Sequence, residues 1–353
     1  MKLVIQIPCF NEAETLPRVL ADIPASLPGI EHIETLVIDD GSSDDTAGVA
    51  RAQGATRVVR HRGNRGLARS FLTGIEVALE MGADIVVNTD GDHQYPGSSI
   101  AQLVAPIVQG EADLVIGDRK TAHDPKVPSR KKLFYGLGNF VVRSTTGVSV
   151  HDAPSGFRAM SREVALSVYL TNPFSYTLET LFEAAEQRFA IREVEIESNP
   201  ATRKSRLFRG VGEYVRRSAG IIVQGYSMHN PLRAFGLLSV PFLLIGFVLG
   251  VRFLYYFIRD PDYSGHIQSL IAAAIASVVG VQILVFGMLG WLMRANRLLL
   301  QDIRRRVRSL ELRGSAQSVQ REAHGGAAQD EPARVHLEAD QQHGARQRDR
   351  ERR

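Results

Sequence analysis

Two long apolar stretches constrain the fold of this chain more than any other feature. Residues 235–258 and 267–293 are each longer than the ~20 residues that an α-helix needs to cross a bilayer, and only the short segment 259–266 joins them. The sequence therefore predicts a hairpin of two transmembrane helices. A buried helical hairpin in a soluble protein is the alternative.

The charges around these two stretches predict their orientation. Arginines flank the pair on the sides that lead to the chain termini, and the link holds one arginine against two aspartates. The flanking residues are Arg217, Arg233, Arg294, Arg297 and the run 304–306. By the positive-inside rule, both termini then lie in the cytoplasm. We expect a multi-pass protein of the cytoplasmic (inner) membrane.

Composition excludes several classes of protein. The chain of 353 residues has one cysteine, Cys9, and a formal net charge of +4. A single cysteine excludes a disulfide framework and a multi-thiolate metal site. Most of the net charge lies in residues 301–353, so the rest of the chain is close to neutral, which argues against a nucleic-acid partner. That last segment has almost no large apolar side chains, and we expect a largely disordered tail there.

Short apolar segments alternate with helix-length amphipathic segments in the first two-thirds of the chain. Strands are predicted over 3–7, 35–38, 57–60, 85–89 and 113–116, and helices over 12–23, 46–53, 67–81 and 100–108. Strand segments that are apolar on both faces are typical of a parallel sheet covered by helices. The sequence predicts an α/β fold: a mostly parallel, doubly wound, Rossmann-like sheet with helices on both faces.

Polar clusters follow three of these predicted strands, at 8–12, 39–42 and 90–92. Sheets of this kind bind ligands at the carboxyl ends of their strands. Asp90 and Asp92 can share one hard divalent cation, and Gln94 can add a neutral oxygen ligand. A solvated acidic turn is the alternative for an isolated Asp-x-Asp triplet. The acidic cluster at another strand end favours the functional interpretation.

Four aspartates lie at the end of the second predicted strand. Asp44 and Asp45 are explained as acids that cap a helix and complement its dipole. Capping does not explain Asp39 and Asp40, which remain attached to the strand. Carboxylates at such positions bond the ribose of a nucleotide in other α/β folds, so we expect a nucleotide here.

Other reactive side chains receive no catalytic role. His93, beside the acidic pair, is interpreted as a partly exposed turn residue, and His61 and His151 have no partner at ligand spacing. Nothing around Cys9 indicates a nucleophile.

Several motifs occur together in this chain: Pro8-Cys9-Phe10-Asn11-Glu12, Asp39-Asp40-Gly41-Ser42, Asn64-Arg65-Gly66 and Asp90-Gly91-Asp92. In this combination the chain resembles family 2 inverting glycosyltransferases of the GT-A fold. Three later segments, 117–119, 152–158 and 202–206, resemble the polyprenyl-phosphate branch of that family. That branch includes the dolichol-phosphate mannose synthases and the undecaprenyl-phosphate glycosyltransferases. The resemblance covers roughly residues 1–225 and, more loosely, the hairpin.

The resemblance implies a role for each matching residue. The nucleotide sugar is held by Pro8, Asn11, Glu12, Asp39, Asp40, Asn64, Gly66, Asp90, Arg203 and Arg206. Mg²⁺ or Mn²⁺ is held by Asp90, Asp92 and Gln94, and the acceptor phosphate by Arg119, Arg130 and Lys131. Catalytic residues are Asp92, Arg119 and Asp152, the last near the donor sugar. The segment 203–206 lacks the glycine usual in mannose synthases, which leaves the donor open between the GDP-mannose and UDP-glucose types.

Elementary chemistry agrees with such a transfer. A nucleoside-diphosphate leaving group gains negative charge, which a divalent cation and arginine can neutralise. A phosphate acceptor is already anionic at neutral pH and needs no general base, whereas a sugar hydroxyl would need one. Asp152 is then expected to orient a sugar hydroxyl or to position cations.

The sequence therefore predicts a membrane enzyme that moves a hexose, with inversion, from a nucleotide sugar to undecaprenyl or dolichyl phosphate. We expect a cytoplasmic catalytic domain over 1–206, amphipathic juxtamembrane helices over 207–232, the hairpin over 233–300 and the polar tail over 301–353. The two spans can also pack within a homo-oligomer. The alternatives are a glycosyltransferase with another lipid or polysaccharide acceptor, and a non-catalytic scaffold that binds nucleotide sugars.

Overall fold

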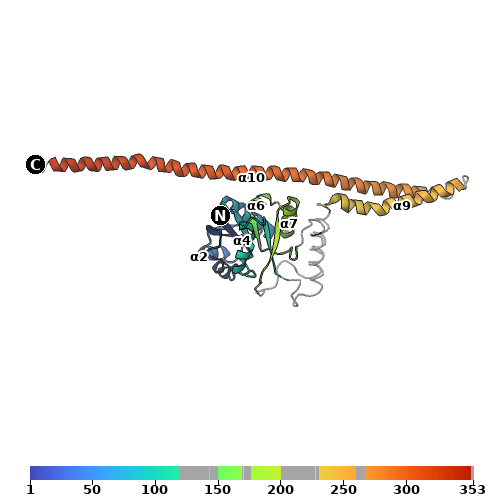
Figure 1. Cartoon of the computed structure of the whole chain (residues 1–353), viewed down its shortest axis with the longest axis horizontal. Helices are drawn as coiled ribbons and strands as arrows, with labels where there is room; N and C mark the ends of the chain where they lie inside the picture. Colours follow the sequence, from blue (N-terminus) through green and yellow to red (C-terminus); the bar gives the residue numbers. More distant parts are fainter. Residues whose placement is uncertain are drawn as a thin grey trace. The chain divides into compact units, whose positions relative to one another are not determined.

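A computed structural model describes residues 1–119, 143, 150–168, 170, 176–199, 227, 230–259 and 267–350, with side chains in the last range to 312 and at 314. The part of the chain up to residue 199 is a sheet with helices on both faces, and two long helices follow it in the sequence (Figure 1).

Seven strands of the described residues form one mixed sheet, in the order β3-β2-β1-β4-β6-β5-β7. Parallel pairing joins β3, β2, β1 and β4, and also β5 and β7, whereas β6 is antiparallel to both of its neighbours. The strands are β1 (Lys2–Cys9), β2 (His32–Asp39), β3 (Arg57–Arg60), β4 (Ile85–Asn88), β5 (Leu114–Asp118), β6 (Arg158–Ser161) and β7 (Ile191–Glu195). The loops after β1, β2 and β4 therefore leave the sheet on the same side, at the carboxyl ends of these parallel strands.

The helices cover the sheet because β1 is apolar on both faces. Leu3, Ile5 and Ile7 belong to a buried cluster with residues of α1 (Leu16–Ala21), α2 (Thr46–Ala52) and α4 (Ile100–Val108). Gln6 faces α3 (Leu67–Glu80), where Gly74 leaves room for the Gln6 side chain, and α3 contacts α6 (Arg162–Ser167). The remaining elements of this part are η1 (Gly97–Ser99) and α7 (Tyr176–Glu186).

The predicted fold class is confirmed. The five predicted strands correspond to β1–β5 and the four predicted helices to α1–α4, with small differences at the ends. Neither β6 nor β7 is predicted. Four buried residues make up β6, including Arg158 and Ser161, and three of the five residues of β7 are charged. Such segments lack the apolar runs by which the other strands are recognised.

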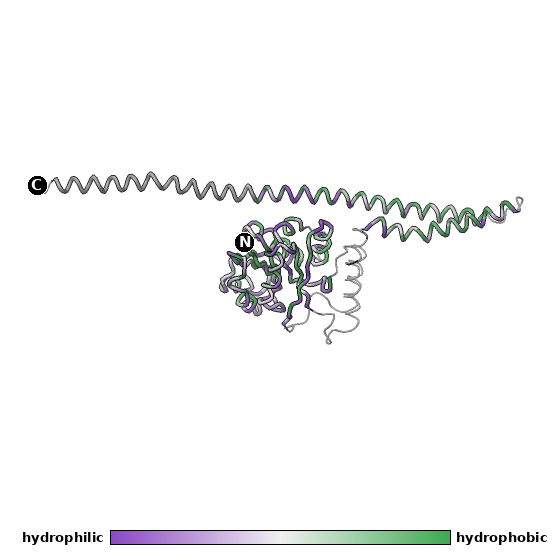
Figure 2. The backbone as a smooth tube through the Cα atoms, in the orientation of Figure 1, coloured by the Kyte–Doolittle hydropathy of each residue, from purple (hydrophilic) through white to green (hydrophobic). Residues whose placement is uncertain are grey.

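The two apolar stretches lie in α9 (Pro231–Arg259) and α10 (Ile267–Arg350). Both helices are long and apolar enough to cross a membrane, and only 11% and 17% of their most apolar windows are buried. The two helices pack through glycines: a Cβ atom at Gly280 would lie 2.7 Å from the Leu243 side chain. Figure 2 shows the apolar residues along both helices. A core helix of a soluble protein would be mostly buried, so these helices indicate association with a membrane.

Helix α10 also covers the last segment of the chain, whose assignment as a largely disordered tail stays a prediction. There α10 continues to Arg350, through the residues for which the composition predicts a tail without regular structure. Alanine, arginine, glutamate and glutamine, which are frequent there, have high helix propensity. A helix also closes its backbone hydrogen bonds locally and does not require apolar burial to do so.

Candidate active site

The loops after β1, β2 and β4 are tied to one another at the edge of the sheet. The backbone N–H of Asn11 donates to the Ser42 hydroxyl (2.9 Å), and the backbone N–H of Ser43 donates to Asn11 Oδ1 (2.8 Å). The Thr15 hydroxyl donates to the carbonyl of Gly91 (2.7 Å). The structure thus brings together the first, second and fourth of the motifs that the sequence singles out.

Asp40, for which the resemblance implies a contact with the nucleotide, is bonded to groups of the protein. Its carboxylate contacts His61 Nδ1 (2.7 Å) and accepts the backbone N–H groups of Arg65 (2.9 Å) and Gly66 (2.8 Å). The residue is 3% exposed. Because its oxygens serve these protein groups, Asp40 positions the loop 61–66. His61 therefore has a partner in Asp40, although its spacing in the sequence suggests none.

Asp39 is fully buried beside it. One of its oxygens accepts the backbone N–H of Ser42 (2.8 Å). The other lies 3.2 Å from Arg60 Nε without the alignment of a hydrogen bond. Asp39 thus fixes the turn after β2 and keeps one buried acceptor oxygen without a hydrogen bond.

Half-buried oxygen ligands gather in the loop after β4. Asp92 Oδ2 accepts the Gln94 side-chain amide (2.8 Å), so these two side chains point to one place. Asp90 is half-buried in the same loop. The segment after β7 holds this loop from outside, since Asn199 donates to the carbonyls of Gln94 (2.9 Å) and His93 (3.0 Å).

A buried polar chain connects this loop to the turn before β6. Gln6 donates to Asn88 Oδ1 (2.9 Å), and Asn88 donates to the carbonyl of Gly156 (2.8 Å). Gly156 lies against Asp90, because a Cβ atom at Gly156 would be 3.3 Å from Asp90 Oδ1. The antiparallel insertion of β6 between β4 and β5 therefore places the predicted acceptor-side turn beside the Asp-Gly-Asp loop.

Arg119 and Asp152 form a two-point ion pair at the end of β5. Arg119 Nε lies 2.7 Å from Asp152 Oδ2, Arg119 Nη2 lies 2.9 Å from Asp152 Oδ1, and the Arg119 backbone N–H also donates to Oδ2 (3.2 Å). Asp152 is fully buried. Its carboxylate therefore orients the Arg119 side chain, which is one of the two roles expected of it, the positioning of a cation.

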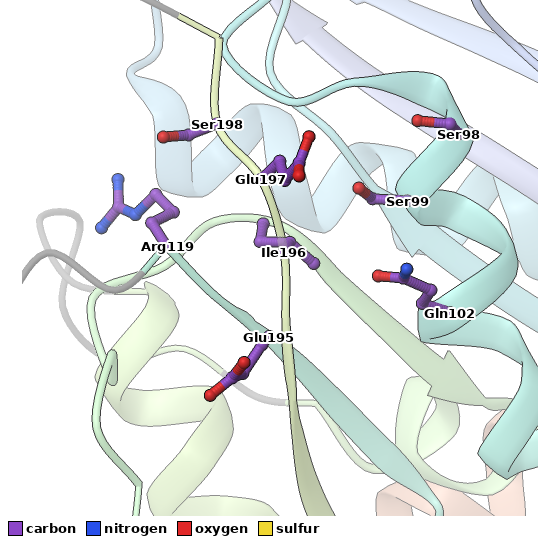
Figure 3. A pocket seen from close by; sticks show the side chains of 8 residues that line it. All are labelled: Ser98, Ser99, Gln102, Arg119, Glu195, Ile196, Glu197 and Ser198. Atoms are coloured by element: carbon purple, nitrogen blue, oxygen red, sulfur yellow. The ribbon is translucent and has the colours of Figure 1, made fainter.

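A pocket of about 770 Å³ adjoins this ion pair. Figure 3 shows Arg119 on one side of the segment that carries Glu195 to Ser198, and Ser98, Ser99 and Gln102 on the other side. The Arg119 side chain remains 19% exposed. It is therefore the cation of this pocket lining that a bound anion can reach.

One further group of side chains has the composition of a metal site: Asp118, His151 and Glu193, whose ligand atoms lie within 4.8 Å of one another. Glu193, however, already accepts the backbone N–H groups of His151 and Asp152 and contacts His151 Nδ1 (2.8 Å). Two of the three members of this group are therefore bonded to each other. His151 thus has a partner that its sequence spacing does not show, and hydrogen bonding to Glu193 raises the pKa of His151.

Cys9 is not a nucleophile. Burial and the neighbouring carboxylates, Glu12 first among them, raise the pKa of its thiol well above the usual value. A thiol in these surroundings carries no thiolate at neutral pH.

The remaining predicted residues are placed as follows. Pro8 and Glu12 are buried at the end of β1 and in the loop after it, and Asn64 is exposed beside the half-buried Gly66. The described residues do not include Arg130, Lys131, Arg203 or Arg206. Sequence reasoning missed Glu193, whose partners His151 and Asp152 lie about 40 positions away, and Arg158, whose burial its sequence surroundings do not show.

Comparison with solved structures identifies the class of protein. A crystal structure of glucosyl-3-phosphoglycerate synthase from Mycobacterium tuberculosis, in complex with Mn²⁺, UDP-glucose and phosphoglyceric acid, matches with a TM-score of 0.51 at 22% identity. The match covers 64% of this chain and 79% of that one. The fold is that of the GT-A glycosyltransferases.

Comparison with sequences identifies the family. The model of "Glycosyl transferase family 2" matches residues 4–168. Polyprenol monophosphomannose synthase of Mycolicibacterium smegmatis is 30% identical over 206 residues, which cover 55% of this chain and 76% of that protein. Undecaprenyl-phosphate mannosyltransferase of Micrococcus luteus is 28% identical over 206 residues, 56% of this chain and 83% of that one. The chain belongs to glycosyltransferase family 2, and relatives of it are polyprenyl-phosphate sugar transferases.

Proposed function

We propose that this glycosyltransferase moves a hexose from a nucleotide-diphosphate sugar to a polyprenyl phosphate, undecaprenyl or dolichyl. One observation carries the proposal: a partly buried arginine, fixed by a buried aspartate, adjoins a pocket at the end of β5, and the turn that follows this aspartate lies against Asp90 of the loop with the oxygen ligands. The loop suits a metal-bound pyrophosphate, and the arginine suits the phosphate of an acceptor. The names of the two relatives support a polyprenyl-phosphate acceptor.

A divalent cation is part of the proposal. Asp90, Asp92 and Gln94 offer only oxygen ligands, which Mg²⁺ and Mn²⁺ prefer. In the structure the Gln94 amide nitrogen contacts Asp92, and rotation of that amide presents its oxygen to the same place. The cation would neutralise the charge that develops on the leaving diphosphate. The donor set fits the cation.

The residues of this chain perform the other parts of the reaction. Arg119 binds the acceptor phosphate and directs one of its oxygens at the anomeric carbon of the donor. That oxygen is anionic at neutral pH, so no base removes a proton. A single displacement of this kind inverts the anomeric configuration. Asp39, Asp40 and Glu12 shape the loops around the nucleotide.

The proposed location is the cytoplasmic face of the inner membrane. Helices α9 and α10 cross the bilayer as a hairpin, with both chain ends on the cytoplasmic side. The phosphate of a long polyprenol lies at that surface, within reach of a catalytic domain anchored next to it.

One assay tests the proposal. Membranes that contain the full chain are incubated with radiolabelled nucleotide sugars of the GDP-mannose and UDP-glucose types, together with undecaprenyl or dolichyl phosphate and Mg²⁺ or Mn²⁺. We expect a labelled lipid with one of the donors, and a product whose anomeric configuration is opposite to that of the donor. Label only in diacylglycerol glycolipid or polysaccharide would establish the other acceptor class, and no label with any donor would support a non-catalytic scaffold.

A further inference from the structure

The turn that carries Asp152 is held from one side by Glu193 of β7. Both Glu193 oxygens lie 2.9 Å from the backbone nitrogen of His151, and one of them accepts the backbone N–H of Asp152 (2.8 Å). His151 Nδ1 contacts the same carboxylate (2.8 Å). The Glu193 side chain is 12% exposed. The Glu193 carboxylate thus accepts the backbone N–H groups of two successive residues.

Two carbonyl groups of the same turn, together with one of α7, are bound by Arg158 of β6. Its guanidinium donates to the carbonyls of Ser155 (2.8 Å), Ala153 (2.6 Å) and Thr177 (2.5 Å), and Arg158 is fully buried. Burial lowers the pKa of Arg158 to about 10, so the guanidinium keeps its charge at neutral pH. The turn is therefore held both by a carboxylate that binds its N–H groups and by a guanidinium that binds its carbonyls.

This arrangement determines where Arg119 points. Asp152 contacts Arg119 through both of its oxygens, and a two-point contact transmits any rotation of the carboxylate to the guanidinium. The backbone N–H of Asp152 is bonded to Glu193, so a change at Glu193 moves Asp152 first and Arg119 next. Glu193 itself does not line the pocket that Arg119 adjoins.

We infer that Glu193 is a positioning residue for the acceptor phosphate, acting through the backbone of Asp152 on the guanidinium of Arg119. The inference rests on the proposed function, in which Arg119 binds that phosphate. Glutamine at position 193 keeps the shape of the side chain but offers one acceptor oxygen in place of two, and turns an N–H₂ group toward backbone donors.

The test is a double-mutant cycle on the full chain in detergent, with undecaprenyl phosphate as acceptor and the donor found active in the assay above. The variants are Glu193→Gln, Arg119→Lys and the double variant. Lysine keeps the positive charge but cannot make the two-point contact with Asp152. We expect Glu193→Gln to raise the KM for undecaprenyl phosphate about tenfold in the wild-type background. The affinity for the nucleotide, measured by calorimetry, should stay within about twofold.

The cycle separates positioning from a general effect on folding. If Glu193 acts through Arg119, its substitution has little further effect once Arg119 is lysine. An equal loss in both backgrounds, or no loss in the wild-type background, overturns the inference. Glu111→Gln is the matched control: Glu111 forms an exposed ion pair with Arg192, the neighbour of Glu193 in β7, and its loss should leave the KM unchanged.

Two further results complete the test. If Glu193→Gln does not fold, Glu193→Asp, which keeps both oxygens on a shorter side chain, goes through the same cycle with the same outcomes. Absence of any lipid product from the wild-type chain refutes the proposed function, whereas a normal product with an unaffected Glu193→Gln variant refutes only the role of Glu193.

Discussion

Gly156 has no side chain at the point where the carboxylate of Asp90 lies. A Cβ atom there would be 3.3 and 3.4 Å from the two oxygens of Asp90, and 2.7 Å from the hydroxyl of Tyr176. The turn before β6 thus limits the space of a carboxylate that the Asp-Gly-Asp loop offers to a cation. Substitutions at this contact and around it give specific predictions.

Gly156→Ala should lower transfer by about 10- to 100-fold, because the added methyl group displaces Asp90 or Tyr176 by a fraction of an ångström or more. Initial rates at saturating donor and metal measure the effect. Gly250→Ala is the control, since a Cβ atom at Gly250 of α9 meets no atom within 4 Å. Equal rates for Gly156→Ala and the wild type would show that Asp90 does not need its present position.

Asp92→Asn should reduce transfer by roughly two orders of magnitude or more while the protein still folds, because it removes a charge that the cation needs and keeps the shape. Transfer rates as a function of Mn²⁺ concentration, with calorimetry of Mn²⁺ binding, check this. Asp84→Asn is the control: Asp84 precedes β4 at the opposite edge of the sheet, where it accepts the backbone N–H of Lys2. Activity within a few-fold of the wild type at saturating metal would disprove the metal assignment.

Cys9 should react slowly with iodoacetamide in the folded protein between pH 7 and about pH 9, because burial raises the pKa of its thiol and keeps it protonated. Mass spectrometry of the alkylated chain measures the rate, with the unfolded chain as the reference. Labelling of the folded protein at the rate of the unfolded one would mean that the loop after β1 opens readily.

His151 should make stability depend on pH in one direction. Its contact with Glu193 raises the folded-state pKa above the value of about 6.5 for an unfolded chain, so the stabilisation is complete below about pH 6.5. It is lost as the pH rises through the raised folded-state value. The Tm difference between the wild type and His151→Gln should therefore be larger at about pH 5.5 than at about pH 9. A pH-independent difference would contradict a charged contact.

Local patterns in the sequence were sufficient to predict one half of the site. Leu3, Ile5 and Ile7 alternate with residues that face α3, and Asp90 and Asp92 directly follow a buried strand, so both the first strands of the sheet and the oxygen-rich loop after β4 are visible along the chain. The contact between Asp40 and His61 was harder to predict, because the two residues lie 21 positions apart in the sequence.

The other half depends on contacts between distant segments. Asp152 meets Arg119 across 33 positions and Glu193 across 41, and both contacts exist because β6 is antiparallel between β4 and β5. The sequence of β6 gives no sign of a strand, so neither the burial of Asp152 nor the role of Glu193 could be derived from spacing. A buried arginine such as Arg158 is equally hard to predict, since arginine is almost never fully buried without partners.

The position of β6 also has a consequence for how the sheet is assembled. In the part of the chain that the structure describes, β5 and β7 join the other strands of the sheet through β6 alone. Strands β1 to β4 can pair as soon as they leave the ribosome. Strand β5, which ends immediately before Arg119, cannot join them until β6, which ends at Ser161, has been synthesised. The four-residue strand β6 thus connects the two parts of the sheet. Its insertion is the late step that brings Arg119 to the loops after β1, β2 and β4 in the growing polypeptide.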